Sequence, residues 1–261
     1  MSNKLSERLI MQKEKGKKGF IPYIMAGDGG LEQLAETIRY LEGLGVSAIE
    51  IGIPFSDPVA DGPSIQEAGL RALAEGVNLR NILAELARHD FTVPLILMTY
   101  ANPVLQMGPK AFAETAADAG VSGCIIPDVP LEEEALFKEP LQELGIVLIR
   151  LVPLTASLER LEALSIGAEG FLYAVTVNGI TGEKAEIELE EIKEKVKQLN
   201  RLTERPIYAG FGISTSQTAN QLFSFCDGII VGSKVVDAIH KNDRNVIEEF
   251  INGLENLSVK V

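Results

Sequence analysis

The feature that most constrains the fold of this 261-residue chain is a regular alternation of short apolar runs with longer amphipathic segments. Apolar, β-branched runs bounded by Gly or Pro predict strands, and apolar residues three and four apart predict helices. Several helical segments end at a glycine. We expect strands at 20–25, 47–53, 93–98, 122–126, 146–151, 169–175, 206–209 and 227–231, and helices at 31–44, 63–75, 78–89, 109–119, 131–144, 157–165, 188–202, 214–223, 233–241 and 243–255.

Strict strand–helix alternation over this length is typical of an α/β protein with the (β/α)8 TIM barrel. A doubly wound open sheet is the alternative, but the turn at 27–30 does not match the G-x-G-x-x-G dinucleotide fingerprint. Residues 2–15 predict an extra N-terminal helix that could close the bottom of the barrel. No Pro/Ser-rich linker or low-complexity tract divides the chain, so we expect a single domain over residues 1–261.

Composition limits which partners the chain can bind and indicates the cellular compartment in which it works. The net charge of −13 without a basic stripe argues against nucleic acid and anionic membranes as partners. No apolar run has the length of a membrane span, and the N-terminus lacks a signal-peptide core. Cys124 and Cys226 lie in separate apolar runs without metal-ligand spacing. We therefore expect a cytoplasmic protein with core thiols and no metal site.

One carboxylate lies within an apolar strand. Alternation along the strand places Glu50 on the face opposite the neighbouring isoleucines. Desolvation there should raise its pKa, as a general acid at neutral pH requires. Asp61, in the polar loop after the same strand, should stay ionised, so the two could divide acid/base work. The structural alternative is that Glu50 pairs with a buried partner and Asp61 caps the helix near Pro63.

Glycines follow the last three predicted strands. They are Gly182, the pair in Gly210-Phe211-Gly212, and Gly232 before Ser233. Glycine lets backbone N–H groups approach an anion, and the helix N-terminus at Ser233 favours negative charge. The pattern predicts a phosphate site, as barrels often have there, although the glycines could simply form turns. The long polar loop at 176–187 predicts either a lid or a passive linker.

Residues 50–63, with the sequence EIGIPFSDPVADGP, closely resemble the signature of the tryptophan synthase alpha subunit family. The likeness extends to residues 100–103, 127–130, 179–182, 210–213 and 231–233. This resemblance implies a TIM-barrel lyase of tryptophan biosynthesis. Such an enzyme cleaves indole-3-glycerol phosphate into indole and glyceraldehyde 3-phosphate by a retro-aldol step.

The resemblance also implies roles for individual residues. Glu50 matches the general acid/base that protonates indole C3 and helps deprotonate the glycerol hydroxyl. Asp61 matches the carboxylate that accepts a hydrogen bond from the indole N–H. Thr181 matches a lid threonine, and Val177 stands where well-known bacterial members carry an arginine. The other matches are an active-site tyrosine, Tyr173; the indole pocket, Phe20, Met98, Ile125, Leu151 and Ile230; and the phosphate site, Gly182, Gly212, Gly232 and Ser233.

A partner is implied as well. The family's beta subunit uses pyridoxal phosphate, receives the indole, and assembles with the alpha subunit as a heterotetramer of two alpha and two beta chains. Asp57, Pro58 and Asn102 match the partner-facing surface, and this chain itself would carry no cofactor. Three alternatives stay open: a free-standing lyase, suggested by Val177; a phosphosugar isomerase with the same phosphate loops; and a non-catalytic subunit that only activates a partner.

Overall fold

A computed structural model describes residues 3–175, 185–210 and 212–257 of the chain. In this part, parallel strands form a single sheet in the order β5-β4-β3-β2-β1-β9-β8-β7-β6. The strands are β1 (Gly19–Met25), β2 (Ile49–Gly52), β3 (Leu95–Met98), β4 (Val121–Ile125), β5 (Val147–Leu148), β6 (Arg150–Pro153), β7 (Leu172–Val175), β8 (Ile207–Gly210) and β9 (Gly228–Val231).

The two ends of this sheet meet within one expected strand. β5 and β6 stand at opposite ends of the strand order, yet only Ile149 separates them along the chain. They correspond to the single strand expected at 146–151. The sheet therefore returns on itself, and the prediction of a TIM barrel is confirmed.

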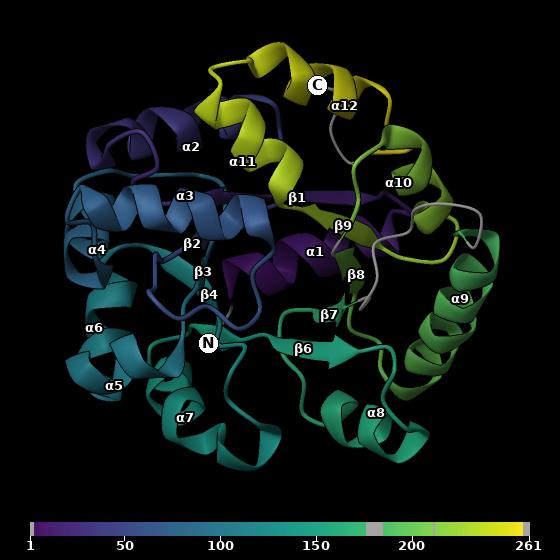
Figure 1. The fold of residues 1–261 in the computed structure, drawn as a ribbon. Helices are drawn as coiled ribbons and strands as arrows, with labels where there is room; N and C mark the ends of the chain where they lie inside the picture. The colour runs from purple at the N-terminus through teal and green to yellow at the C-terminus, as the bar shows by residue number, and fades with distance from the viewer. Residues whose placement is uncertain (1–2, 176–184, 211, 258–261) are drawn as a thin grey trace.

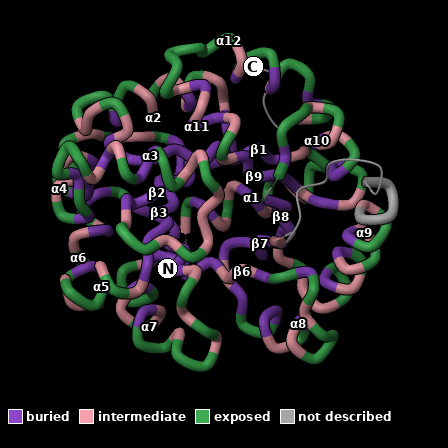
Figure 2. The backbone as a smooth tube through the Cα atoms, in the orientation of Figure 1, coloured by how far each residue is buried: buried purple, intermediate pink, exposed green. Residues whose placement is uncertain are grey.

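Helices surround the barrel, with buried strands inside and exposed helix faces outside (Figures 1 and 2). This arrangement buries both faces of most of the parallel strands, which explains why they read as continuous apolar runs. The outer helices are α2 (Leu34–Gly43), α3 (Pro63–Ala74), α4 (Leu79–Leu86), α5 (Ala101–Met107), α6 (Pro109–Asp118), α7 (Ala135–Glu143), α8 (Leu158–Ser165), α9 (Ala185–Leu202), α10 (Ser216–Phe223), α11 (Ser233–His240) and α12 (Arg244–Asn252).

Helix α5 occupies a segment that the sequence predicts to be a loop. Its first N–H group, on Ala101, donates to both carboxylate oxygens of Asp128, at 2.9 and 3.2 Å. A negative charge at this end stabilises a helix, and Pro103 falls in the first turn, where its missing N–H costs nothing. Asp128 belongs to the loop after β4. The group that stabilises the start of α5 is thus remote in the sequence.

The N-terminal helix α1 (Lys4–Glu14) covers the end of the barrel at which the strands begin. Its inner face is buried through Leu5, Leu9 and Gln12. Polar side chains from this segment donate to carbonyl oxygens just before strands, which fixes the helix against the barrel. These bonds join Asn3 to Gly145, Arg8 to Val46 and Lys13 to Arg205.

Tyr208 of β8 fills the interior next to α1, and two glycines make room for its ring. The side chain is 1% exposed, and its hydroxyl lies 3.5 Å from Oε1 of Gln12. An ideal Cβ at Gly228 would lie 2.2 Å from Cε1 of this tyrosine, and one at Gly19 would lie 1.9 Å from its hydroxyl oxygen. No side chain fits at either position without displacing the ring.

We expect Gly228→Ala to destabilise the barrel by about 1–3 kcal/mol, since the new methyl group overpacks the interior. Gly43→Ala is the matched control, because nothing lies within 4 Å of its Cβ position in α2. Alanine there should be neutral or stabilising by up to about 1 kcal/mol through helix propensity. The midpoints of urea unfolding measure both effects, and equal shifts would contradict this account of the interior.

Candidate active site

Strand β2 carries Glu50 into the barrel interior. The residue is 1% exposed and pairs in register with Tyr23 of β1 and Ile96 of β3. Within the described part of the chain, neither carboxylate oxygen has a hydrogen-bond partner. Burial raises the pKa of Glu50 to about 8, and the nearby charge of Asp61 contributes to the rise. At neutral pH the group is therefore mostly protonated, and the expected upward shift of its pKa is confirmed.

Asp61 lies in the loop between β2 and α3, where Tyr100 holds it. The Tyr100 hydroxyl donates to Oδ2 of Asp61 at 3.2 Å and accepts from the backbone N–H of Ala60 at 3.1 Å. The Tyr100 ring also stacks on Phe55, with ring centroids 5.0 Å apart. One side chain from the end of β3 thus fixes the loop that carries the second carboxylate.

The Asp61 carboxylate is less solvated than the sequence suggests. Burial raises its pKa, and the hydrogen bond from Tyr100 acts in the opposite direction. The sequence predicts that Asp61 stays ionised, and its burial acts against that prediction while the Tyr100 bond supports it. The charge of Asp61 in turn contributes to the raised pKa of Glu50.

The purely structural interpretation of these carboxylates finds no support in the described residues. Helix α3 begins at Pro63 with Gly62 as its N-cap and has no side-chain capping bond, so Asp61 does not cap it. Glu50 has no buried partner there either. A buried polar group without a partner calls for a functional explanation.

Two buried tyrosines, Tyr23 and Tyr173, flank the carboxyl pair. Burial, followed by the charges of Glu50 and Asp61, raises the pKa of each phenol well above its ordinary value. Each ring lies over a glycine. An ideal Cβ at Gly52 would lie 1.8 Å from the Tyr23 hydroxyl oxygen, and one at Gly210 would lie 2.3 Å from Cε2 of Tyr173.

Phe20 does not join this cluster. Its ring lies 5.8 Å from that of Phe250 in α12, centroid to centroid, so it faces the outer helices. Tyr23, three residues further along β1, points inward and takes the interior position that the family resemblance had suggested for Phe20. Sequence reasoning missed Tyr23, although its odd spacing from Phe20 was the available signal.

The other apolar residues expected in the pocket lie on the inner face. Met98 and Ile125 are register partners at the ends of β3 and β4, and Leu151 pairs with Tyr173. Ile230 lies two residues after Gly228, the glycine that receives the Tyr208 ring, and so shares its inward direction. Together they give an apolar wall at the end of the barrel where the strands finish.

A helix N-terminus opens next to this wall. Helix α11 begins at Ser233, after Gly232, without a side-chain capping bond. The N–H of Val235 already donates to the Gly232 carbonyl oxygen, so the N–H groups of Ser233 and Lys234 are the ones left for an anion. Gly212 adopts a φ of 76°, which favours glycine. Three residues of the loop predicted at 176–187, namely Val177, Thr181 and Gly182, lie outside the described residues.

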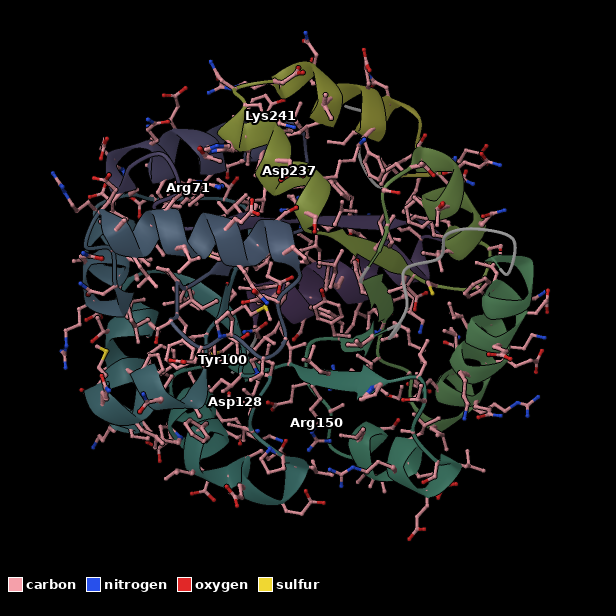
Figure 3. All side chains as sticks on the ribbon, viewed as in Figure 1. Arg71, Tyr100, Asp128, Arg150, Asp237 and Lys241 are labelled. Carbon is pink, nitrogen blue, oxygen red and sulfur yellow. The ribbon has the colours of Figure 1, made fainter. Side chains whose placement is uncertain are left out.

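The surface near Tyr100 is hollowed beside Phe55, on which the Tyr100 ring stacks. A groove of about 630 Å³ runs between the β2–α3 loop and α5, and its walls include Phe55 and Asn102. Asp57 is exposed beside it, and Pro58 is half-buried. Figure 3 shows Tyr100 and Asp128 close together near this surface.

In the described residues, no helix is long and apolar enough to cross a membrane. Nor do these residues include a group of three or more His, Cys, Asp and Glu side chains placed to hold a metal ion.

Known proteins resemble the whole chain. A sequence model of the family described as tryptophan synthase alpha chain matches residues 9–260. A tryptophan synthase alpha chain from Bacillus cereus is 48% identical over 247 residues, covering 94% of this chain and 95% of the relative. The one from Bacillus mycoides is 46% identical over 251 residues, covering 95% and 97%.

Solved structures agree with the sequence relatives. The tryptophan synthase subunit alpha of Legionella pneumophila superposes with a TM-score of 0.84 at 32% identity, covering 97% of each chain. A chain of tryptophan synthase from M. tuberculosis, in an aminoacrylate-bound form, gives a TM-score of 0.86 at 29% identity. It covers 97% of this chain and 100% of that one.

Titration of Glu50 should make stability depend on pH. Between the ordinary pKa of 4.5 and about 8, the folded protein holds a proton that the unfolded chain releases. Stability contributed by the neutral acid is therefore lost as pH rises through this window, and the loss levels off above it. We expect Glu50→Gln to be nearly neutral at pH 5 and stabilising by roughly 2–4 kcal/mol at pH 9.

Urea unfolding at the two pH values measures this difference. Glu114→Gln is the matched control, because Glu114 lies on the exposed face of α6. A Glu50→Gln effect that is the same at pH 5 and pH 9 would show that Glu50 does not titrate between them.

Proposed function

Since this chain belongs to the tryptophan synthase alpha chain family, we propose that it cleaves indole-3-glycerol phosphate into indole and glyceraldehyde 3-phosphate. The observation that carries the proposal is the state of Glu50. A buried carboxyl group, protonated at neutral pH and without a partner in the described residues, is suited to give a proton to a substrate held in the barrel.

The retro-aldol step requires two proton transfers at neighbouring atoms. Glu50 donates its proton to C3 of the indole ring, which leaves a cationic indolenine. The resulting carboxylate, or a water beside it, takes the proton of the adjacent chain hydroxyl. The carbon–carbon bond to C3 then breaks, its electrons return to the ring to restore indole, and the chain carbon becomes the aldehyde of glyceraldehyde 3-phosphate.

Asp61 stabilises the charge that develops in this step. Its carboxylate accepts a hydrogen bond from the indole N–H and lies opposite the positive charge of the indolenine. Tyr100 holds that carboxylate through the 3.2 Å bond and favours its ionised form. A fixed dipole of this kind needs no rearrangement when the charge appears, which is the source of its catalytic effect.

The two ends of the substrate match two ends of the site. The apolar wall formed by Met98, Ile125, Leu151 and Ile230 suits the indole ring, with Tyr173 beside it. The N-terminus of α11 at Gly232 and Ser233, together with Gly212, suits the phosphate group. Gly182 and Thr181 belong to the same proposal through the family resemblance alone.

We further propose that the chain works with a beta subunit in a complex of two alpha and two beta chains. The groove beside Phe55 and Asn102, the exposed Asp57 and the half-buried Pro58 supply the contact surface. Tyr100 links this surface to Asp61, because its ring stacks on Phe55 while its hydroxyl holds the carboxylate. Partner binding there would tighten the catalytic loop and raise the rate.

No step proposed for this chain needs a cofactor, because carboxyl groups supply both proton transfers. Pyridoxal phosphate would belong to the beta subunit. We place the reaction in the cytoplasm, since a charged phosphate ester does not cross a bilayer without a large desolvation cost.

We expect Glu50→Gln to lower the rate of indole release by about 100-fold to 10,000-fold, the usual contribution of a general acid/base. Asp61→Asn should lower it by about 100-fold to 1,000-fold. Indole is measured with and without a beta subunit, and Glu114→Gln on the surface of α6 is the control. Undiminished release from Glu50→Gln would overturn the mechanism. Activation of the beta subunit without any indole release by native protein would favour a non-catalytic subunit.

The proposed interface can be tested with a matched pair of exposed apolar residues. Val59, in the β2–α3 loop, is 79% exposed, and Ile166, after α8, is 74% exposed. We expect Val59→Asp to weaken binding of the beta subunit at least about tenfold, because a charge would be desolvated in the interface. Ile166→Asp should leave binding unchanged. Isothermal titration with the beta subunit decides the matter. Failure of native protein to bind would favour a free-standing lyase.

A further inference from the structure

Neither the acid pair nor the anion site gives a role to Tyr23, a buried side chain with a polar end. Tyr23 is 4% exposed, and no hydrogen bond joins its hydroxyl to any of the described residues. Its oxygen is not among the described buried atoms that lack a partner, so the hydroxyl itself is open to the space that a ligand would fill.

The strand order places Tyr23 between the two ends of the site. β1 lies between β2, which carries Glu50, and β9, which leads into Gly232. Tyr23 is the register partner of Glu50, and its hydroxyl lies over Gly52. On its other side, an ideal Cβ at Gly232 would lie 3.8 Å from the Tyr23 Cβ. Tyr23 therefore borders both the acid pair and the helix terminus.

The hydroxyl is available as a hydrogen-bond donor. Burial and the two carboxyl groups raise the pKa of the Tyr23 phenol well above its ordinary value, so the proton stays in place at every pH at which the protein is used. No hydrogen bond joins this hydroxyl to Glu50 or to Asp61, whose bond from a phenol comes from Tyr100. The acceptor is thus to be sought in what the barrel binds.

We propose that Tyr23 is a substrate-positioning residue whose hydroxyl donates a hydrogen bond to a hydroxyl of the three-carbon chain between indole and phosphate. The inference rests on the proposed function. A substrate with its indole at Glu50 and its phosphate at Gly232 must cross β1, and Tyr23 is the polar side chain that β1 directs inward there. This contact sets the position of the chain carbon whose bond breaks.

If this contact exists, removing the Tyr23 hydroxyl should weaken only the binding of ligands that carry hydroxyl groups on the chain. Tyr23→Phe removes the phenol oxygen and keeps the ring over Gly52. We expect it to lower kcat/KM for indole-3-glycerol phosphate by about 3-fold to 10-fold, the effect of one neutral hydrogen bond. Indole-3-propanol phosphate lacks both chain hydroxyls, so as an inhibitor it should bind native and variant protein equally well.

Tyr208→Phe is the matched control, because Tyr208 is also buried in the barrel but lies beside α1 and Gln12. It should change neither kcat/KM nor the inhibition constant. If Tyr23→Phe weakened inhibitor binding by the same factor as kcat/KM, the residue would have a structural role. If kcat/KM did not change, the residue would have no role. Either result overturns the inference, provided that native protein still releases indole. Absence of indole release by native protein would instead overturn the proposed function.

Discussion

The cost of charging a carboxyl group inside an apolar barrel governs the arrangement of this site. An ionised Glu50 would lack both water and a described hydrogen-bond partner, so the neutral acid is the stable form at neutral pH. The same lack of compensation makes the group reactive, because its proton can pass to a substrate. Any added donor beside Glu50, such as an arginine, would stabilise the carboxylate and remove the acid.

Burial raises the pKa of Asp61 as well, and a hydrogen bond from Tyr100 acts against that rise. The phenol oxygen bonds both the carboxylate and the backbone of its loop, so charge and position are fixed together. Its ring connects them to Phe55 at the surface groove. The proposed partner site and the proposed chemistry thus share one side chain, which gives a physical route for coupling between them.

Much of this arrangement could be predicted from sequence, because in a barrel of alternating strands and helices consecutive strands lie side by side and end on the same side. Alternation within a strand gave the inward direction of Glu50, and the repeated strand–helix pattern placed the glycines at the same end. Phe20 and Tyr23 show the limit of this reasoning. Both are aromatic residues of one strand, and only the register with β2 shows which one faces the carboxyl group. Helix α5 was missed because its stabilising carboxylate, Asp128, comes from another loop. The pKa of Asp61 depends on burial by a fold that local sequence does not show.

Helix α1 covers the end of the barrel at which the strands begin, and this limits how a small molecule can enter or leave the interior. Leu5, Leu9 and Gln12 occupy that end, so a small molecule has no route along the axis in that direction. Entry and exit then share one opening. For the proposed reaction, the apolar product would leave past the loops that admit its phosphorylated precursor. The proposed partner, seated on those loops, would then control whether the product reaches water.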